Sequence, residues 1–170
     1  MARNAAKRKS RDRKPDEGYQ AASIYSIGYE GKSIHLFIDM LKQSGVERLI
    51  DLRETPFSRK PGFSKRALES NLLSAGIGYF SIPELGTNKQ SRKRYKEDGN
   101  IFALLEEFQS RLEQNFNQYE YLKSLAIAQT SSIMCFEEDP KLCHRQIIEN
   151  ELESDGFKVI HLCNGQQKRS

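Results

Sequence analysis

The feature that most constrains the fold is a regular alternation of short apolar runs and amphipathic segments from residue 23 onward. The amphipathic segments place apolar residues at helical spacing, as in Ile34, Phe37 and Leu41. Such alternation predicts parallel strands joined by right-handed crossovers, with helices on both faces of one sheet. The predicted strands cover residues 23–27, 46–52, 77–82, 132–136 and 157–162.

Capping and turn residues mark the ends of the predicted helices. Ser33 starts the first helix and Gly45 stops it. Residues 84–99 are polar and basic, and we predict a long loop there. The fold class is therefore α/β: a single three-layer domain with a mostly parallel sheet of about five strands and helices on both faces. The other predicted helices cover residues 64–73, about 100–115, 118–129 and 143–154.

The positive charge is concentrated at the N-terminus. Residues 1–20 hold seven Lys or Arg and three Asp or Glu, a net charge of +4, which equals that of the whole chain. They lack branched aliphatic residues, and we expect a disordered basic tail that either binds nucleic acid or only improves solubility. The α/β domain is expected over residues 21–165, followed by a short polar C-terminal tail over 166–170.

The composition argues against several classes of protein. The 170 residues contain no run of 18 apolar residues, so no membrane partner is expected. The charged N-terminus does not resemble a secretory signal. Three cysteines without such a signal indicate free thiols and a cytoplasmic location.

Chemically capable side chains follow the predicted strands. In open α/β sheets, ligands bind at the carboxyl ends of the strands, so these residues are candidates for one site. We expect Gly28, Tyr29, Arg53, Ser58 and His144 to bind substrate, and Glu137, Cys143 and Arg145 to be catalytic.

Cys143 is the strongest candidate for a reactive side chain. It follows Pro140 at the predicted start of a helix, where backbone N–H groups and the dipole favour a thiolate. Arg145 adds positive charge there, and Glu137 is placed to transfer a proton or to form an ion pair. A structural thiol is the alternative, and it is the favoured interpretation for Cys135, which ends an apolar strand.

Other residues near the strand ends allow further interpretations. Arg53 shares one side of its strand with Asp51, so it either forms a buried salt bridge or clamps a phosphate or carboxylate. The Cys-x7-Cys-His spacing from Cys135 is not that of a standard zinc site, so we predict no metal. Gly28-x-x-Gly31 is too short for a dinucleotide fingerprint, and no cofactor is expected.

Several sequence blocks have an order and spacing that point to one family. The blocks are Tyr25 to Gly31, Asp51-Leu52-Arg53 with Pro56 and Ser58, Tyr79 with Leu85-Gly86, Cys135-Phe136-Glu137, and Cys143-His144-Arg145. Together they resemble the domain-of-unknown-function family 488 (DUF488). The resemblance covers roughly residues 23–163, and it implies a compact three-layer α/β domain found in bacteria, archaea and phages, without a settled reaction. After Leu85-Gly86, family members often have more glycine, whereas this chain continues Thr87-Asn88-Lys89.

Two functions from different classes follow from the sequence. The first is an enzyme acting on a nucleotide or nucleic acid, with Cys143 as nucleophile or acid, Glu137 as proton-transfer group and Arg53 and Arg145 as anion holders. The second is a non-catalytic module that binds nucleic acid or an anionic ligand. Nucleic acid or a phosphate-bearing small molecule is thus the expected partner, and the sequence does not indicate an oligomeric state.

Overall fold

The computed structural model describes residues 22–163 and 166–169 and contains one six-stranded sheet. The strand order is β3-β2-β4-β1-β5-β6, with β1 to β5 parallel and β6 antiparallel to β5. The predicted α/β class is confirmed, whereas the disordered tail predicted over residues 1–20 lies outside the described residues. The strands are β1 Ser23–Gly28, β2 Arg48–Asp51, β3 Gly78–Ser81, β4 Ser131–Cys135, β5 Lys158–Cys163 and β6 Gln166–Arg169.

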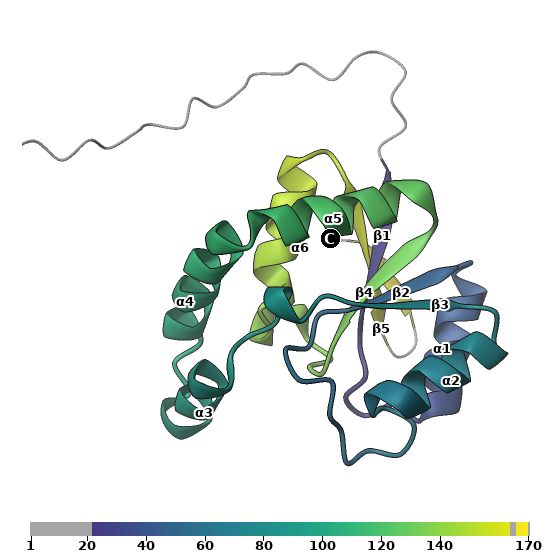
Figure 1. Cartoon of the computed structure of the whole chain (residues 1–170), viewed down its shortest axis with the longest axis horizontal. Helices are drawn as coiled ribbons and strands as arrows, with labels where there is room; N and C mark the ends of the chain where they lie inside the picture. Colours follow the sequence, from purple (N-terminus) through teal and green to yellow (C-terminus); the bar gives the residue numbers. More distant parts are fainter. Residues whose placement is uncertain (1–21, 164–165, 170) are drawn as a thin grey trace, which may run out of the picture.

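Helices cover both faces of the sheet (Figure 1). α1 and α2 lie on one face, and α5 and α6 lie on the other, while α3 and α4 extend to one side of the latter pair. Two single turns of 3-10 helix, η1 Pro83–Leu85 and η2 Pro140–Leu142, precede α3 and α6. The helices are α1 Ile34–Gln43, α2 Lys65–Ser74, α3 Lys89–Asp98, α4 Ile101–Gln114, α5 Phe116–Ala128 and α6 Arg145–Ser154. Within the described ranges, no helix is long and apolar enough to cross a membrane.

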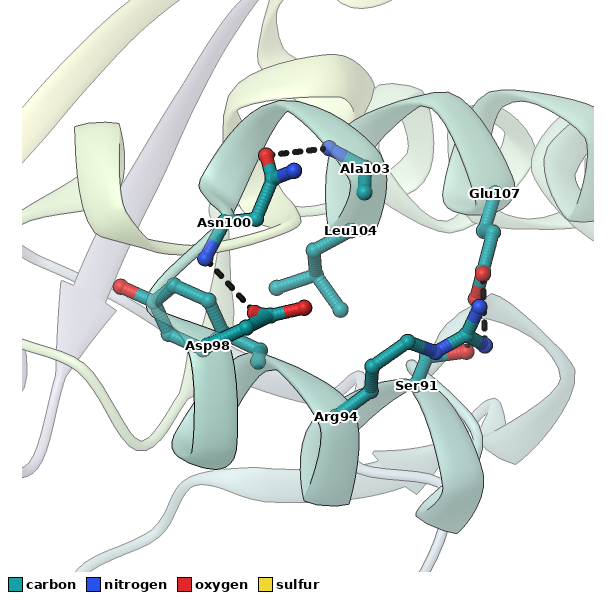
Figure 2. Close-up of a pocket in the computed structure, with 8 residues that line it drawn as sticks. Ser91, Arg94, Asp98, Asn100, Ala103, Leu104 and Glu107 are labelled. Carbon is teal, nitrogen blue, oxygen red and sulfur yellow. Dashed lines mark hydrogen bonds and ion pairs between the residues drawn. The ribbon is translucent and has the colours of Figure 1, made fainter.

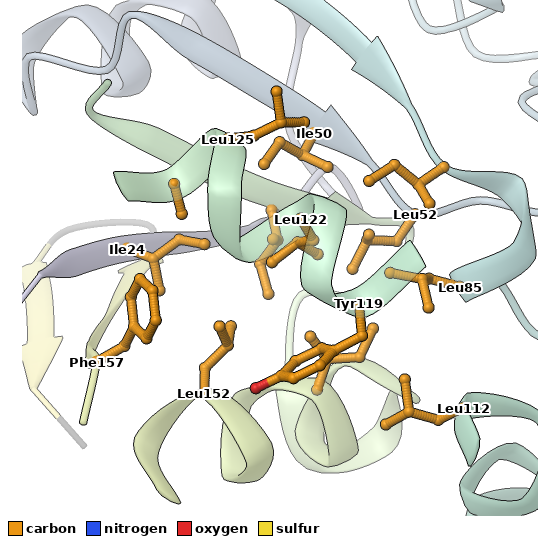
Figure 3. Packing of buried hydrophobic residues seen from close by; sticks show 14 of the residues in the cluster. Ile24, Ile50, Leu52, Leu85, Leu112, Tyr119, Leu122, Leu125, Leu152 and Phe157 are labelled. Atoms are coloured by element: carbon orange, nitrogen blue, oxygen red, sulfur yellow. The ribbon is translucent and has the colours of Figure 1, made fainter. Parts of the chain in front are cut away.

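Each face of the sheet has its own hydrophobic core. Successive strand residues point to opposite faces, so Ile133 and Met134 of β4 belong to different clusters. Met134 belongs to the cluster with Phe37 and Leu68 beneath α1 and α2, while Ile133 belongs to the cluster with Leu122 beneath α5 and α6. Figure 3 shows the second cluster around Leu122 and Tyr119. Each fully buried aliphatic or aromatic side chain contributes roughly 1.5–3 kcal/mol, so the two layers hold the sheet rigidly from both sides.

The helix order places a topological switch at β4. This strand lies between β2 and β1, which are followed by α2 and α1 on one face. β4 itself is followed by α6 on the opposite face. The chain therefore leaves neighbouring strands in opposite directions, and open α/β sheets bind ligands outside the carboxyl ends of such strands. The carboxyl end of β4 is thus the place to examine for a functional site.

The prediction of a long loop over residues 84–99 is wrong, because most of this segment forms α3. Asn88 caps this helix by accepting a hydrogen bond from the backbone N–H of Ser91, and Gly99 ends it in the left-handed conformation. Helix-favouring Lys, Arg, Gln and Glu residues fill the interval, so capping and propensity define a helix that has almost no apolar stripe. The C-terminal segment expected as a polar tail holds β6, which adds an antiparallel edge to β5.

Candidate functional site

The centre of the candidate site is formed by two thiols and an imidazole at the end of β4. Cys135 is the last residue of this fully buried strand, and the chain returns through η2 to Cys143 and His144. Asp139 accepts a hydrogen bond from the backbone N–H of Lys141 at 2.9 Å, which fixes the turn that brings the chain back. The two sulfurs lie 3.9 and 3.7 Å from His144 Nδ1, respectively, and all three side chains are buried.

The start of α6 supplies positive charge to this centre. The backbone N–H of Arg145 donates to Cys143 Sγ at 3.5 Å. The Arg145 guanidinium is 1% exposed and donates from Nη1 to Ser26 Oγ at 3.0 Å and from Nη2 to the Glu137 carbonyl at 2.6 Å. The helix starts at Arg145 rather than at Cys143, but the first backbone N–H still reaches the sulfur, as the sequence predicts.

The two thiols have opposite electrostatic environments. Burial raises the pKa of Cys143, but the hydrogen bond with Cys135 and the charges of His144 and Arg145 outweigh it, so this pKa falls well below its ordinary value. The pKa of Cys135 rises well above the ordinary value because of its hydrogen bond with Cys143 and its burial. Cys143 is therefore the more acidic thiol of the pair, and its negative form is stabilised by the Cys135 thiol, His144 and Arg145.

Glu137 is held partly protonated near neutral pH. Burial, followed by the charge of Cys143, raises the pKa of this carboxyl group from 4.5 to about 7. The pKa of Arg145 also rises, because the neighbouring negative charges of Cys143, Cys135 and Glu149 outweigh the effect of its burial. A carboxyl group that titrates near pH 7 can both give and take a proton there.

The site also holds most of the unpaired polar atoms of the described structure. Among the described residues, four buried side-chain nitrogen or oxygen atoms lack a hydrogen-bond partner: Glu137 Oε2, His144 Nε2, Arg145 Nε and Arg48 Nε. Three of the four belong to the candidate site. Leaving a buried polar atom unpaired costs about 1–3 kcal/mol, so such clustering calls for an explanation beyond folding.

Gly28 and Tyr29 lie directly against the loop that follows β4. A Cβ atom on Gly28 would lie 1.9 Å from the Glu137 carbonyl oxygen, so only glycine allows this close approach. The backbone N–H of Tyr29 donates to the Cys135 carbonyl at 3.3 Å. Beyond Tyr29, the buried Lys32 forms an ion pair with Glu138, which further ties the two loops together.

Arg53 belongs to a separate, fully paired cluster. Its Nε and Nη2 donate to the Asp51 carboxylate at 2.7–3.1 Å, and its Nη1 donates to the Phe63 carbonyl at 2.8 Å. Tyr79 donates to the same carboxylate at 2.8 Å, and its pKa is raised by burial and by the charge of Asp51. The buried salt bridge considered in the sequence analysis is therefore present. Tyr29 connects this cluster to the site, because its hydroxyl group lies 3.3 Å from Arg53 Nη1.

Ser58 is placed farther out, in the loop between β2 and α2. Its hydroxyl group accepts a hydrogen bond from the backbone N–H of Lys60 at 3.1 Å and so shapes a local turn. The Lys60 ammonium group donates to the Tyr29 carbonyl at 2.8 Å. Ser58 is thus linked to the site only through this loop, and its role in substrate binding stays a prediction.

Sequence reasoning missed several residues that support the site. The Thr87 hydroxyl group lies 2.9 Å from His144 Nδ1, and Ser26 Oγ donates to Glu149 Oε1 at 2.5 Å. Glu149 also lies 3.1 Å from His161 Nε2, so a buried polar chain runs from Arg145 through Ser26 to β5. Only strand register and helix phase reveal these partners, because each lies inside an ordinary strand, helix or loop pattern.

A small, shallow hollow lies elsewhere, between α3 and α4 (Figure 2). Glu107 pairs there with Ser91 and with Arg94, the latter at 2.6 Å, and the Asp98 carboxylate accepts from the Asn100 backbone. None of the residues that line this hollow belongs to the predicted site. Its polar groups pair with each other and serve to pack the two helices.

Comparison with known protein families places this chain in one of them. The family model "Domain of unknown function DUF488" matches residues 33–152. This chain belongs to the DUF488 family. The match runs from α1 into α6 and includes Arg53, Glu137, Cys143 and Arg145, which confirms the resemblance found in the sequence. No curated protein and no solved structure matches the chain.

Proposed function

We propose that this DUF488 protein is a thiol-dependent enzyme that acts on phosphate esters of the nucleotide or nucleic-acid class. The observation that carries the proposal is that Glu137, His144 and Arg145, each with one unpaired buried polar atom, surround the Cys143 thiol at the switch point of the sheet. A purely structural network would satisfy these atoms, because each unpaired one is costly. Substrate groups would supply the missing partners.

The proposed roles follow from the chemistry of each group. The Cys143 thiolate attacks phosphorus, and an S–P bond forms as the bond to the leaving oxygen breaks. Protonated Glu137 gives its proton to that oxygen. Water then attacks the phosphorus and passes a proton to the Glu137 carboxylate, while the S–P bond breaks and the thiolate returns. Arg145 holds the phosphoryl charge, with its unpaired Nε as a free donor.

The remaining predicted residues surround this centre in the proposal. Gly28 lets the loop after β4 lie against the end of β1, and the buried Tyr29 holds that loop through its backbone N–H, so both position the centre rather than touch the phosphate. The His144 imidazole stabilises the thiolate through Nδ1, which lies 3.7 Å from Cys143 Sγ. Arg53 would act by holding Tyr29 in place, since its own donors are already engaged.

The burial of the thiols favours a second candidate function. Cys143 is 1% exposed and Cys135 is 6% exposed, so a substrate reaches the sulfur only if the residues around it move apart. A non-catalytic module that binds an anionic ligand through Arg145 needs no such access. The two functions therefore differ in whether Cys143 reacts.

Thiol labelling of the metal-free protein separates the two functions. Iodoacetamide labelling against pH, with peptides identified by mass spectrometry, should show that Cys143 reacts faster than Cys135 at neutral pH. Hydrolysis of p-nitrophenyl phosphate and bis(p-nitrophenyl) phosphate should be lost in Cys143→Ser and retained in Cys163→Ser. Equally slow labelling of Cys135 and Cys143, with no phosphorylated adduct in the intact mass, would favour the binding module.

Nucleic acid is the proposed source of the phosphate, and salt dependence tests it. Seven basic residues over 1–20 would neutralise phosphates and release counterions. Deletion of residues 1–20 should therefore flatten the salt dependence of binding to a DNA oligonucleotide. An unchanged slope would assign these residues to solubility and leave a small phosphate ester as the substrate.

A further inference from the structure

The ligand atoms of Cys135, Cys143 and His144 all lie within 4.8 Å of one another. A tetrahedral zinc ion with Zn–S of about 2.3 Å and Zn–N of about 2.0 Å separates its sulfur and nitrogen ligands by about 3.6 Å. His144 Nδ1 lies 3.7 and 3.9 Å from the two sulfurs. We propose that Cys135, Cys143 and His144 form a binding site for Zn²⁺.

The fold explains why the spacing in the sequence does not show this site. Cys135 ends β4, and seven residues separate it from Cys143, whereas standard structural zinc sites use closer pairs. The turn η2 reverses the chain, and the Cys143 backbone N–H donates to the Pro140 carbonyl at 3.0 Å. The chain leaves β4 at Cys135, and this turn brings the adjacent residues Cys143 and His144 back to the end of that strand.

The donor set selects the kind of metal. Two thiolates and one imidazole are soft or intermediate ligands, which favour Zn²⁺ over Mg²⁺ or Ca²⁺. Three protein ligands leave a fourth position of the tetrahedron for water or substrate. The Thr87 hydroxyl group lies 2.9 Å from His144 Nδ1, so a metal bound to Nδ1 replaces this hydrogen bond and leaves the hydroxyl group beside the metal position, where it can bond to a water.

The surroundings of the three ligands support the assignment. The Arg145 backbone N–H donates to Cys143 Sγ at 3.5 Å, and such outer-shell bonds orient ligands in metal sites. His144 is 3% exposed, and its Nε2 has no partner. A metal at Nδ1 gives this buried ring one strong bond that offsets the unpaired nitrogen. Two thiolates also balance the charge of Zn²⁺ inside the protein.

This site does not rest on the proposed enzyme function, although it uses the same sulfur. A zinc ion takes a lone pair of Cys143, so the metal-bound and thiol-reactive forms exclude one another. Zinc binding and phosphate-ester hydrolysis are measured separately, and either can fail alone. Protection of Cys143 from alkylation by zinc would link them.

Cobalt provides the spectroscopic test on the full chain. Titration of the reduced, metal-free protein with Co²⁺ should produce a thiolate-to-cobalt charge-transfer band and the visible bands of tetrahedral cobalt, and Zn²⁺ should displace both. Cys135→Ser, Cys143→Ser and His144→Asn should each weaken binding by more than the roughly 10–100-fold cost of losing an outer-shell partner. Cys163→Ser, the matched control at the third cysteine, should bind as the wild type does.

A second measurement needs no variant and so does not depend on the variants folding. Zn²⁺ should protect Cys135 and Cys143 of the wild type from iodoacetamide, while Cys163 stays equally reactive. Octahedral cobalt without a charge-transfer band would overturn the site. So would wild-type affinity in a folded Cys135→Ser variant, or labelling of Cys143 that is unaffected by zinc.

Discussion

Two buried arginines follow neighbouring strands of the same sheet, and their surroundings differ in one respect. Arg53 comes after β2, and every nitrogen of its guanidinium donates a hydrogen bond inside its cluster, mostly to the carboxylate of Asp51. Arg145 comes after β4, and its Nε has no partner. No carboxylate of the described residues forms an ion pair with it. The completeness of pairing thus distinguishes a cluster that stabilises the fold from one that has capacity left for a ligand.

Removal of Arg53 should have the largest effect. Arg53→Met leaves the Asp51 carboxylate, which is 0% exposed, without its cation, and this should lower the free energy of unfolding by roughly 3–5 kcal/mol. Arg145→Met should cost less, because no carboxylate loses a direct partner. Urea unfolding monitored by circular dichroism measures both, and the double variant Asp51→Asn/Arg53→Met is the control. A larger loss in Arg145→Met would break the comparison.

The protonation of Glu137 should produce the next largest effect. Its pKa is raised from 4.5 to about 7 in the folded protein, so the folded state binds more protons than the unfolded state between these values. The resulting stability is fully present below pH 4.5 and is lost as the pH rises through 7, by up to about 3 kcal/mol. Unfolding of metal-free protein at several pH values measures this slope.

Glu137→Gln should remove that part of the pH dependence. Glu84→Gln, which changes an exposed carboxylate, should leave it intact and serves as the control. Cys143→Ser should narrow the pH range over which Glu137 changes the free energy of unfolding, because the charge of Cys143 is the second cause of the raised pKa of Glu137. An unchanged slope in Glu137→Gln would mean that another group is responsible.

Two strand glycines should respond with opposite signs. Gly28→Ala forces a Cβ atom against the Glu137 carbonyl, and overpacking of this kind costs about 1–3 kcal/mol. Gly78→Ala meets its nearest atom, on the Phe80 ring, at 3.5 Å and should be neutral or stabilising by about 0.4–1 kcal/mol. Thermal unfolding measures both. Gly28→Ala should also change the labelling rate of Cys143. An unchanged melting temperature of Gly28→Ala would contradict this prediction and would show that the loop after β4 can shift to make room for a Cβ atom.

The smallest effect should come from the contact between Thr87 and His144. Thr87→Val removes the hydroxyl group 2.9 Å from His144 Nδ1 and should cost about 1 kcal/mol. The rate of Cys143 labelling should change as well, because the imidazole that faces its sulfur loses its other partner. Thr55→Val, at an exposed position, is the control for both measurements. Equal behaviour of the two variants would make the Thr87 contact dispensable.

Hydrophobic periodicity predicted the strands and most helices because burial dictates the pattern in those elements. Periodicity failed at α3, which has almost no stripe of apolar residues. This helix depends on its caps, Asn88 and Gly99, and on the helix propensity of the residues between them. Periodicity also failed at β6, whose residues Gln166–Arg169 are polar and gain their structure from pairing with β5. Backbone pairing at a sheet edge does not require apolar side chains, so no periodic signal marks it.

The rule that ligands bind at the carboxyl ends of parallel strands selected Cys143, Glu137 and Arg145 as candidates, because these ends meet at one edge of the sheet. It could not separate Arg53 from Arg145, since only the structure shows which donors are engaged. It also could not bring Cys135 and Cys143 together across the seven residues between them. That contact depends on the turn η2, whose geometry is not visible in residue types alone.

The position of β4 also has a consequence for how the chain is made. β1 and β2 are consecutive in sequence but do not pair, and Ser131 of β4 lies between Ile24 and Arg48 in the sheet. A nascent chain therefore carries the pair β2–β3 and an unpaired β1, with an empty place between them, until residues beyond 130 leave the ribosome. Contacts of such long sequence separation form slowly and expose strand edges meanwhile. Because Cys135 ends the strand that fills this place and Cys143 follows it in the chain, the candidate site can form only after β4 has been made, and β5 and β6 are added later still.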